Sequence, residues 1–258
     1  PSYFGAYRTP DVNKGKIKNV GFEFELRFNK VLKNGMRFWA NANYTYAHNE
    51  IIIKDDPSLI PSYRKAQGYS QGQFHAYIDQ GFISTYDELY SSPAHQSNDS
   101  QVLIGDHYIV DFNGDGVVDE TNDQAPYGYT GNPEHTYNAT IGWEWKGFSL
   151  FAQLYGVTGV TRDVTLNSFP DQLLTVYDTG SWWNPVAGGG DVVVPRFNTQ
   201  PTAGNNGTQF IFDGSYFRLK NVEVAYTWTK GWIKKLGFTS LKVYLNGNNL
   251  FLITKMPD

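Results

Sequence analysis

The chain has 258 residues and a mass of 29.2 kDa, a length that fits one large domain or two small ones. Aromatic residues make up 16% of the chain, only 18% of residues are charged, and mean hydropathy is −0.45. Apolar side chains are therefore diluted by uncharged polar ones, which disfavours both intrinsic disorder and a helical bundle. A net charge of −4 without a basic stripe argues against nucleic acid as a partner.

The absence of cysteine excludes a disulfide scaffold, a thiolate metal site and a cysteine nucleophile. No run approaches the roughly 18 consecutive apolar residues of a membrane-spanning helix. A membrane β-barrel stays possible, because its signal is alternation and not a continuous apolar run. The chain begins Pro1-Ser2-Tyr3, without an initiator methionine or a signal peptide, so we expect a piece of something longer.

The first predicted elements are two strands joined by a tight turn. Residues 21–29 alternate apolar and charged side chains, and residues 36–49 alternate apolar and polar ones, although Trp39 interrupts the polar face. Lys33-Asn34-Gly35 between them supplies the positive φ of a hairpin turn. The apolar set of the first strand is Phe22, Phe24, Leu26 and Phe28.

Two further hairpins follow. The second joins residues 137–145 to residues 148–157 across Lys146-Gly147, and the third joins residues 216–229 to residues 241–246 through a longer turn. We count six confident strands, with two to four more expected inside the connections. From alternation alone, a membrane barrel and a soluble β-sandwich fit equally well.

The connections between the hairpins are long and rich in Gly, Pro, Asn, Asp and Ser. They span residues 50–134 and 159–213, and loops of that length usually carry function. Short turns at one end and long loops at the other are the rule in outer-membrane barrels, as are aromatic residues at the interfaces. The residues that fit such aromatic girdles are Tyr44, Tyr46, Trp143, Trp145, Tyr226 and Trp228.

Residues 111–119 predict a calcium-binding loop. Oxygen ligands at positions 1, 3 and 5, a glycine at 6, a backbone carbonyl at 7 and a carboxylate at 9 match most of the hard-cation loop of an EF-hand. Position 12 is Asn122 instead of a bidentate Glu, so we expect modest affinity and a structural role. The alternative is a turn with solvated carboxylates. The predicted ligands are Asp111, Asn113, Asp115, Val117 through its carbonyl, and Asp119.

Enzyme chemistry finds little support, because the five histidines are scattered and no nucleophile, phosphate-loop or zinc motif is present. No catalytic residue is assigned. The long connections carry many aromatic residues flanked by amides, which suit stacking on sugars or peptide side chains. Most of them we expect to pack the loops internally. Trp182 and Trp183, near Gly188-Gly189-Gly190, are the better ligand or lid candidates.

Several segments resemble the C-terminal half of SusC/RagA-type TonB-linked outer-membrane transporters of the Bacteroidota. They occur in family order over nearly the whole chain, and together they are specific. The segments are NKGKIKNVGFE (13–23), DFNGDG (111–116), NP (132–133), WKGFSL (145–150), SYFRLKNV (215–222), WIKKLG (232–237) and NNLF (248–251).

The resemblance implies an all-β fold, a segment of an antiparallel 22-strand transmembrane barrel in the outer membrane, with residues 50–134 and 159–213 as long extracellular loops. Such transporters import oligosaccharides or peptides with energy from the TonB complex, under a SusD-like surface lipoprotein. The plug domain, the TonB box and the terminal strands are expected to lie outside residues 1–258. An alternative role within the same family is that of a structural subunit of a larger surface complex.

The alternative function is a secreted, calcium-stabilised β-rich carbohydrate-binding or glycan-hydrolase domain, which rests on the same aromatic loops and acidic motif. One observation separates the two. In a barrel the alternate apolar residues face outward with no protein against them, whereas in a sandwich a second sheet covers them.

Overall fold

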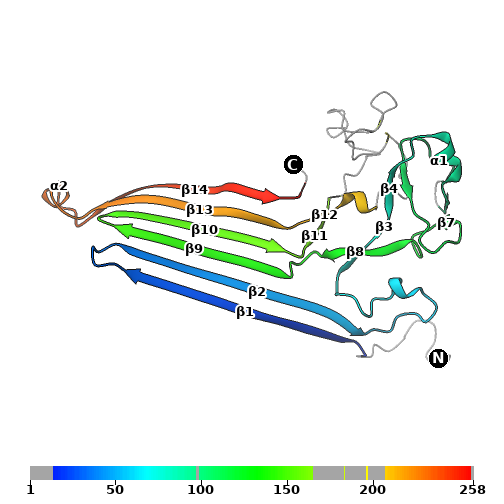
Figure 1. Cartoon of the computed structure of the whole chain (residues 1–258), viewed down its shortest axis with the longest axis horizontal. Coiled ribbons are helices and arrows are strands. Elements are labelled where there is room, and N and C mark those ends of the chain that lie inside the picture. The colour runs from blue at the N-terminus through cyan, green and yellow to red at the C-terminus, as the bar shows by residue number, and fades with distance from the viewer. Residues whose placement is uncertain (1–13, 97–98, 165–182, 184–195, 197–206, 257–258) are drawn as a thin grey trace.

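The protein is an elongated antiparallel sheet with a cluster of short elements at one end (Figure 1). The computed structural model describes residues 14–96, 99–164, 183, 196 and 207–256. Six long strands pair in the order β1-β2-β9-β10-β13-β14, so every strand pairs with the next long strand in the chain. Their bounds are Lys16–Val31 (β1), Arg37–Ile53 (β2), His135–Trp145 (β9), Phe148–Thr158 (β10), Tyr216–Trp228 (β13) and Leu241–Thr254 (β14).

All three predicted hairpins are confirmed. Gly35 has φ +79° in the first turn, and Lys146 and Gly147 have φ +48° and +91° in the second. Positive φ at both central residues matches the right-handed twist of the flanking strands, which is why this two-residue connection forms a hairpin. The third turn contains a short helix, α2 (Trp232–Lys235), that alternation did not predict.

The sheet has one apolar and one polar face. The register places Phe24 beside Tyr44, Tyr44 beside Tyr137, and Leu154 beside both Ala139 and Leu219. The apolar face is exposed: the exposed fraction is 57% for Phe24, 55% for Leu26 and 50% for Ile141. Other exposed members of this face are Phe22, Phe28, Tyr137, Phe148, Leu150, Phe217, Val224, Val243, Leu245, Phe251 and Ile253.

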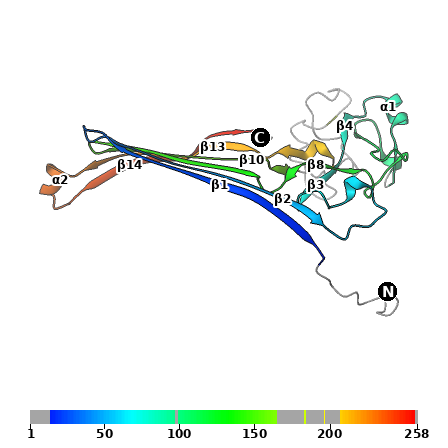
Figure 2. The same ribbon diagram turned by 60° about the horizontal axis from the view of Figure 1, so that its bottom comes forward.

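No second sheet packs on the apolar face in the part of the chain that the structure describes, as the two views show (Figures 1 and 2). Ala139 is half-buried, in keeping with its small side chain between neighbouring strands. A soluble β-sandwich requires the apolar face to be covered. The exposed apolar face therefore favours a barrel wall over a sandwich.

A β-bulge keeps the two faces consistent along β13. In the pairing of β13 with β10, Lys220 is an extra residue between Leu219 and Asn221, and the pairing with β14 shifts at the same place. Because side chains alternate with period two, an uncompensated extra residue would move every later side chain to the other face. The bulge leaves Leu219 and Val222 on the apolar face and Arg218 and Asn221 on the polar one.

The described parts of both long connections lie at the end of the sheet opposite the hairpin turns (Figure 1). The first contains α1 (Tyr86–Ser91), which begins with a capping box formed by Thr85 and Glu88. The strands and 3-10 turns of the connections are η2 (Ser62–Arg64), β3 (Gln73–Tyr77), β4 (Asp79–Phe82), β5 (Ala94–His95), η3 (Asp99–Gln101), β6 (His107–Ile109), β7 (Val117–Val118), β8 (Gln124–Thr130), β11 (Thr161–Asp163), η5 (Thr208–Phe210) and β12 (Ile211–Asp213).

These short elements have a core of their own. Tyr77, Ile109 and Val118 form a buried cluster, and Ile83 of the first connection and Phe210 of the second are also almost fully buried. The six-stranded sheet, in contrast, has few buried apolar side chains. The hydrophobic core of the described residues thus lies mainly in the loops, which gives them a defined shape.

Candidate functional site at the loop end of the sheet

The two long connections pack against each other. The amide of Asp79 donates a hydrogen bond to Thr208 Oγ1 at 3.1 Å, and the amide of Tyr129 donates to Thr161 Oγ1 at 2.7 Å. A buried ion pair joins Asp106 to Arg196 at 3.0 Å. These bonds link residues far apart in sequence and build one rigid loop cluster over the end of the sheet.

Burial of Asp106 raises its pKa, although the hydrogen bond from the Leu103 amide and the Arg196 guanidinium act in the opposite direction. The Leu103 amide donates to Asp106 Oδ2 at 2.9 Å. Such a desolvated carboxylate is stable only with its partners in place. Asp106 and Arg196 are 90 residues apart in the sequence, so no local residue pattern predicts that they form a pair.

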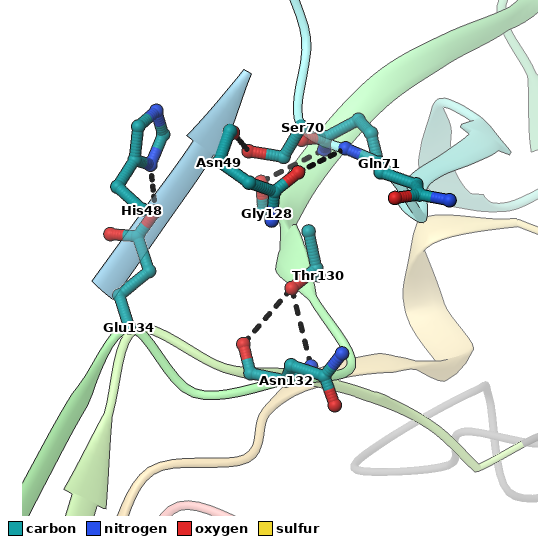
Figure 3. A network of polar contacts seen from close by, with 9 residues as sticks. His48, Asn49, Ser70, Gln71, Gly128, Thr130, Asn132 and Glu134 are labelled. Atoms are coloured by element: carbon teal, nitrogen blue, oxygen red, sulfur yellow. Dashed lines mark hydrogen bonds and ion pairs between the residues drawn. The ribbon is translucent and has the colours of Figure 1, made fainter. Parts of the chain in front are cut away.

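A cavity of about 310 Å³ lies where β1 and β2 meet the loops. His48 Nδ1 and Glu134 Oε1 lie 2.6 Å apart at its edge (Figure 3). Asn49 accepts hydrogen bonds from the Ser70 hydroxyl and the Gln71 amide, each at 2.7 Å. The lining residues are Asn19, Val20, Gly21, Ala47, His48, Asn49, Ser70, Thr130, Asn132, Pro133 and Glu134.

The wall of this cavity is more apolar than polar, with a few hydrogen-bonding groups placed in it. Thr130 Oγ1 donates to the Asn132 carbonyl at 2.9 Å and accepts from the Asn132 amide (Figure 3). Gly21 is required at its wall, because an added Cβ would come within 2.4 Å of the Tyr46 carbonyl oxygen. Amide, hydroxyl and imidazole groups of this kind suit hydrogen bonding to sugars or peptide backbones.

The predicted calcium loop is folded around its own carboxylates. Asp111 accepts hydrogen bonds from the amides of Gly114 at 2.7 Å and Gly116 at 2.6 Å, and Asp115 accepts from the Val117 amide at 2.9 Å. Asp119 accepts from the Asn122 amide at 2.7 Å. A side-chain hydrogen bond from Asn113 is the main reason why the pKa of Asp115 is lowered.

Asp123, outside the predicted ligand set, is fully buried and holds both ends of this loop. It accepts from the Phe112 amide at 2.7 Å through one oxygen and from the Asp119 amide at 2.7 Å through the other. No group of three or more His, Asp or Glu side chains is arranged to hold a metal ion in the described ranges. The predicted set includes an amide and a carbonyl, so calcium binding by Asp111, Asn113, Asp115, Val117 and Asp119 stays a prediction.

Trp183 lies inside the loop cluster. Only 7% of it is exposed, and its ring contacts Gly105 so closely that an added Cβ would come within 2.2 Å of Trp183 Cε3. Its indole Nε1 is buried without a hydrogen-bond partner among the described residues. This position suits a packing role; a role for Trp183 in ligand or lid contact stays a prediction. Trp182 lies outside the described residues.

The histidines do not assemble into a catalytic group in the ranges that the structure describes. His48 pairs with Glu134, and His107 pairs with Asp79 at 3.1 Å. His135 lies 2.8 Å from the Tyr44 hydroxyl, and His75 lies 3.2 Å from the Gln73 carbonyl oxygen. The contacts of His48, His107 and His135 each join neighbouring parts of the fold, and that of His75 stays within β3, so all four suit a structural role.

The comparisons with known proteins agree with the resemblance seen in the sequence. No protein-family model matches the chain. The chain is 24% identical over 260 residues to a TonB-dependent receptor P3 of Formosa agariphila, which covers 95% of this chain and 25% of the relative. The fold is similar to the RagAB peptide importer in its open-open state, with a TM-score of 0.63 and 20% identity over 94% of this chain and 26% of that one.

The chain resembles the TonB-dependent receptors in sequence and has the fold of their barrel wall. A second structure, of the RagAB peptide transporter, gives a TM-score of 0.61 at 17% identity, again over 94% of this chain and 26% of that one. The chain therefore spans about a quarter of the length of the TonB-dependent receptor it matches. Among its described residues, no helix is long and apolar enough to cross a membrane.

Proposed function

We propose that the chain forms part of the wall and the external vestibule of a TonB-dependent receptor in the outer membrane of a Gram-negative bacterium of the Bacteroidota. In this proposal the receptor imports a large nutrient, an oligosaccharide or a peptide. The exposed apolar face of the sheet carries the proposal, because soluble proteins rarely leave so large an apolar face uncovered and such faces mark contact with a membrane or a protein. The opposite face, with its amides and charges, then lines the lumen.

The aromatic residues support the orientation in a bilayer. Tyr44, Tyr46 and Tyr137 lie on the apolar face near the loops, and Trp143, Trp145, Tyr226 and Trp228 lie on the same face near the turns. Strand β9, from His135 to Trp145, has 11 residues. At about 3.4 Å per residue and a tilt of about 40°, it spans ~26 Å along the normal, which matches the apolar band of ~25 Å in outer-membrane barrels.

The same orientation puts the loop cluster outside the cell. Residues 50–134 and 159–213 are then extracellular loops, and a SusD-like surface lipoprotein is the proposed partner on them. Tyr86 and Tyr90 on α1 support this docking surface, because they are 67% and 84% exposed in a folded loop. Energy from the TonB complex would enter through parts of the receptor that this chain does not include.

The proposed role is binding and passage, not catalysis. It is supported by the separate structural contacts of the histidines, and by relatives that are named as receptors, importers and transporters. The proposal includes both nutrient classes, because the amide and hydroxyl groups around the cavity at His48 and Asn49 can form hydrogen bonds with sugars and with peptides.

Single-cysteine labelling tests the orientation, and this chain offers a clean background because it contains no cysteine. Phe24→Cys and Glu23→Cys place a label on opposite faces at the same depth of β1. In the intact protein reconstituted in lipid vesicles, a spin label at position 24 should be reached by oxygen and protected from a water-soluble relaxant. The label at position 23 should show the reverse, and equal water access at both positions would contradict the proposal.

Uptake by cells tests the nutrient class. A strain that lacks the gene should lose growth on one class of large nutrient, oligosaccharides or peptides, while growth on the corresponding monomers is unchanged. Complementation by the intact gene should restore it. Normal growth of the deletion strain on both classes would contradict an import role.

A further inference from the structure

A cluster of aromatic and basic side chains lies on the polar face near the loops. The Arg218 guanidinium carbon is 5.5 Å from the ring centre of Tyr155 and 5.3 Å from that of Tyr216. Lys220 Nζ is 5.5 Å from the ring centre of Tyr155. The two tyrosine ring centres lie 6.1 Å apart, so the guanidinium lies beside both rings at once.

The register explains this grouping. Tyr155 of β10 is the direct neighbour of Arg218 on β13, and Val157 is the neighbour of Tyr216. Lys220 is the extra residue of the bulge, and the ring contact places its amine on the same face as Arg218. Arg218 and Lys220 are two residues apart, so strand alternation also puts them on one face, and two positive charges lie on one side of the sheet within three residues.

Neither charge has an acidic partner among the residues that the structure describes. Arg218 and Lys220 form no ion pair there, and Arg218 Nε is buried without a hydrogen-bond partner. Other basic residues on the same face are paired: Arg37 with Glu144 at 3.5 Å, and Lys242 with Glu223 at 2.7 Å. Arg218 and Lys220 thus form a patch of net positive charge with unused donors.

The neighbouring side chains on this face are neutral hydrogen-bonding groups. Gln153 donates to Asn138 at 3.3 Å, and Asn138 is the direct neighbour of Tyr155. Asn221 follows Lys220 and is the direct neighbour of Gln153. An anion that enters the patch would meet two cations, amide side chains and two aromatic rings.

We propose that Tyr155, Tyr216, Arg218 and Lys220 form a subsite that binds a carboxylate group of the imported nutrient. This inference rests on the proposed function, since it places the polar face in the lumen and the patch just below the vestibule. A guanidinium presents its donors in a planar fork that matches a carboxylate, and the flanking tyrosines fix its orientation in advance. The lysine adds a second charge for an oxygen of the same group.

A carboxylate can come from two sources, the C-terminus or acidic side chain of a peptide, or a uronic acid of an oligosaccharide. The test uses the intact protein, purified in detergent, and titration calorimetry with matched probes. One pair is a neutral-side-chain octapeptide with a free or an amidated C-terminus. The other pair is a short oligogalacturonide and its methyl ester.

At least one free carboxylate should bind about 10-fold or more tightly than its blocked form, a difference that corresponds to ~1.4 kcal/mol. Arg218→Gln should reduce this preference to near one, and Lys220→Gln should reduce it in part. The preference should also fall with added salt. The pair that shows it identifies the source of the carboxylate.

Tyr155→Phe is the matched control, because it keeps the ring beside Arg218 and should keep the preference. Equal binding of free and blocked probes, or a preference that survives in both Arg218→Gln and Lys220→Gln, would overturn the inference. The inference would also be overturned if Arg218→Gln lowered the thermal stability and left the preference for free carboxylates unchanged. That result would assign the patch to contact with another part of the receptor. If cells still import neutral nutrients, the proposed function stands even when the subsite fails.

Discussion

The indole ring of Trp39 lies against Gly142 of the neighbouring strand. The two residues are direct neighbours on β2 and β9, and a methyl group added at Gly142 would come within 2.0 Å of Trp39 Cε2. Phe151 completes the contact, with its ring centre 6.0 Å from that of Trp39. The tryptophan that interrupts the polar alternation thus packs over a glycine, because only a residue without a side chain leaves room for the indole ring.

Gly142→Ala should therefore destabilise the intact protein. Overpacking at a filled contact typically costs ~1–3 kcal/mol. Gly131→Ala is the matched control, because its added Cβ meets only Arg162 Nη1 at 3.6 Å. Unfolding in urea, followed by the heat-dependent shift in gel mobility, measures both; equal midpoints for the two variants would contradict the packing described for Trp39.

A charge on the apolar face should also be costly. Leu26→Arg on β1 should lower the free energy of unfolding by roughly 2–4 kcal/mol near the bilayer midplane, because arginine must leave water for lipid. Glu23→Arg, on the polar face of the same strand, should change it by no more than about 0.5 kcal/mol. Unfolding from lipid vesicles is the measurement, and a Leu26→Arg variant as stable as Glu23→Arg would argue against membrane contact.

Calcium should order residues 111–119. Hydrogen exchange at the Val117 and Val118 amides should become faster when a chelator is added to the unmodified protein. Asp111→Ala should give fast exchange in both conditions, since it removes the acceptor of the Gly114 and Gly116 amides. The sheet should stay folded throughout. Identical exchange with calcium and with chelator in the unmodified protein would leave the loop as a hydrogen-bonded turn without a metal.

The ribbon formed by β11 and β12 should loosen in acid. Hydrogen bonds from Ser215, its side chain first, lower the pKa of Asp213, and the Lys255 amine adds to this effect. A carboxyl group with a lowered pKa in the folded state stabilises that state at pH values above its unfolded pKa, and this contribution is lost as the pH falls through the folded pKa. Opening of the ribbon should therefore increase below about pH 4, the region of an ordinary Asp pKa.

Amide exchange at Gly214 and Ser215 between pH 6 and pH 3, corrected for the intrinsic rate, measures this opening. Asp213→Asn removes the titrating group and should give a flatter profile. If Asp213→Asn keeps the full pH dependence, the effect comes from another carboxylate.

Trp183 should respond to its glycine neighbour. Gly105→Ala forces a side chain into the Trp183 ring, whereas Gly81→Ala meets nothing within 4 Å. Both glycines have positive φ, +96° and +106°, so both variants carry a similar backbone cost. Gly105→Ala alone should shift tryptophan fluorescence to longer wavelength. If Trp183 also contributes to lid contact, the same variant should weaken capture of the proposed lipoprotein partner. Matching capture by both variants would restrict Trp183 to packing.

Alternation predicted the sheet well because the two faces meet different surroundings. The strand around Phe22 and Phe24 repeats its pattern without interruption, and the structure confirms it as β1. Strand β14 runs to Thr254, whereas the sequence predicted its end at Asn246. The residues that follow, Gly247 to Asn249, are of types common in turns. Asn249 has the φ of +51° expected in a turn, but it lies opposite the β13 bulge, where the register shifts, and the pairing of the two strands continues beyond it.

The loop cluster was less predictable, because its contacts are long-range. The capping box of α1 was visible as Thr85 followed by Glu88, yet a short helix inside a long loop carries little periodicity. The Asp106–Arg196 pair and the contact of Trp183 with Gly105 depend on how two distant connections meet. Local residue patterns do not contain that information.

The bulge at Lys220 also bears on how such a wall can change over generations. A single residue inserted into or deleted from a strand moves every later side chain to the opposite face, so it would turn Glu223 to the apolar face and Val224 to the polar one. Length changes in the strands are then tolerated in pairs, or singly where a bulge absorbs them. The loops carry no such parity rule. In the proposed receptor, new specificity would therefore arise freely in the loops, while the wall varies almost only by substitution.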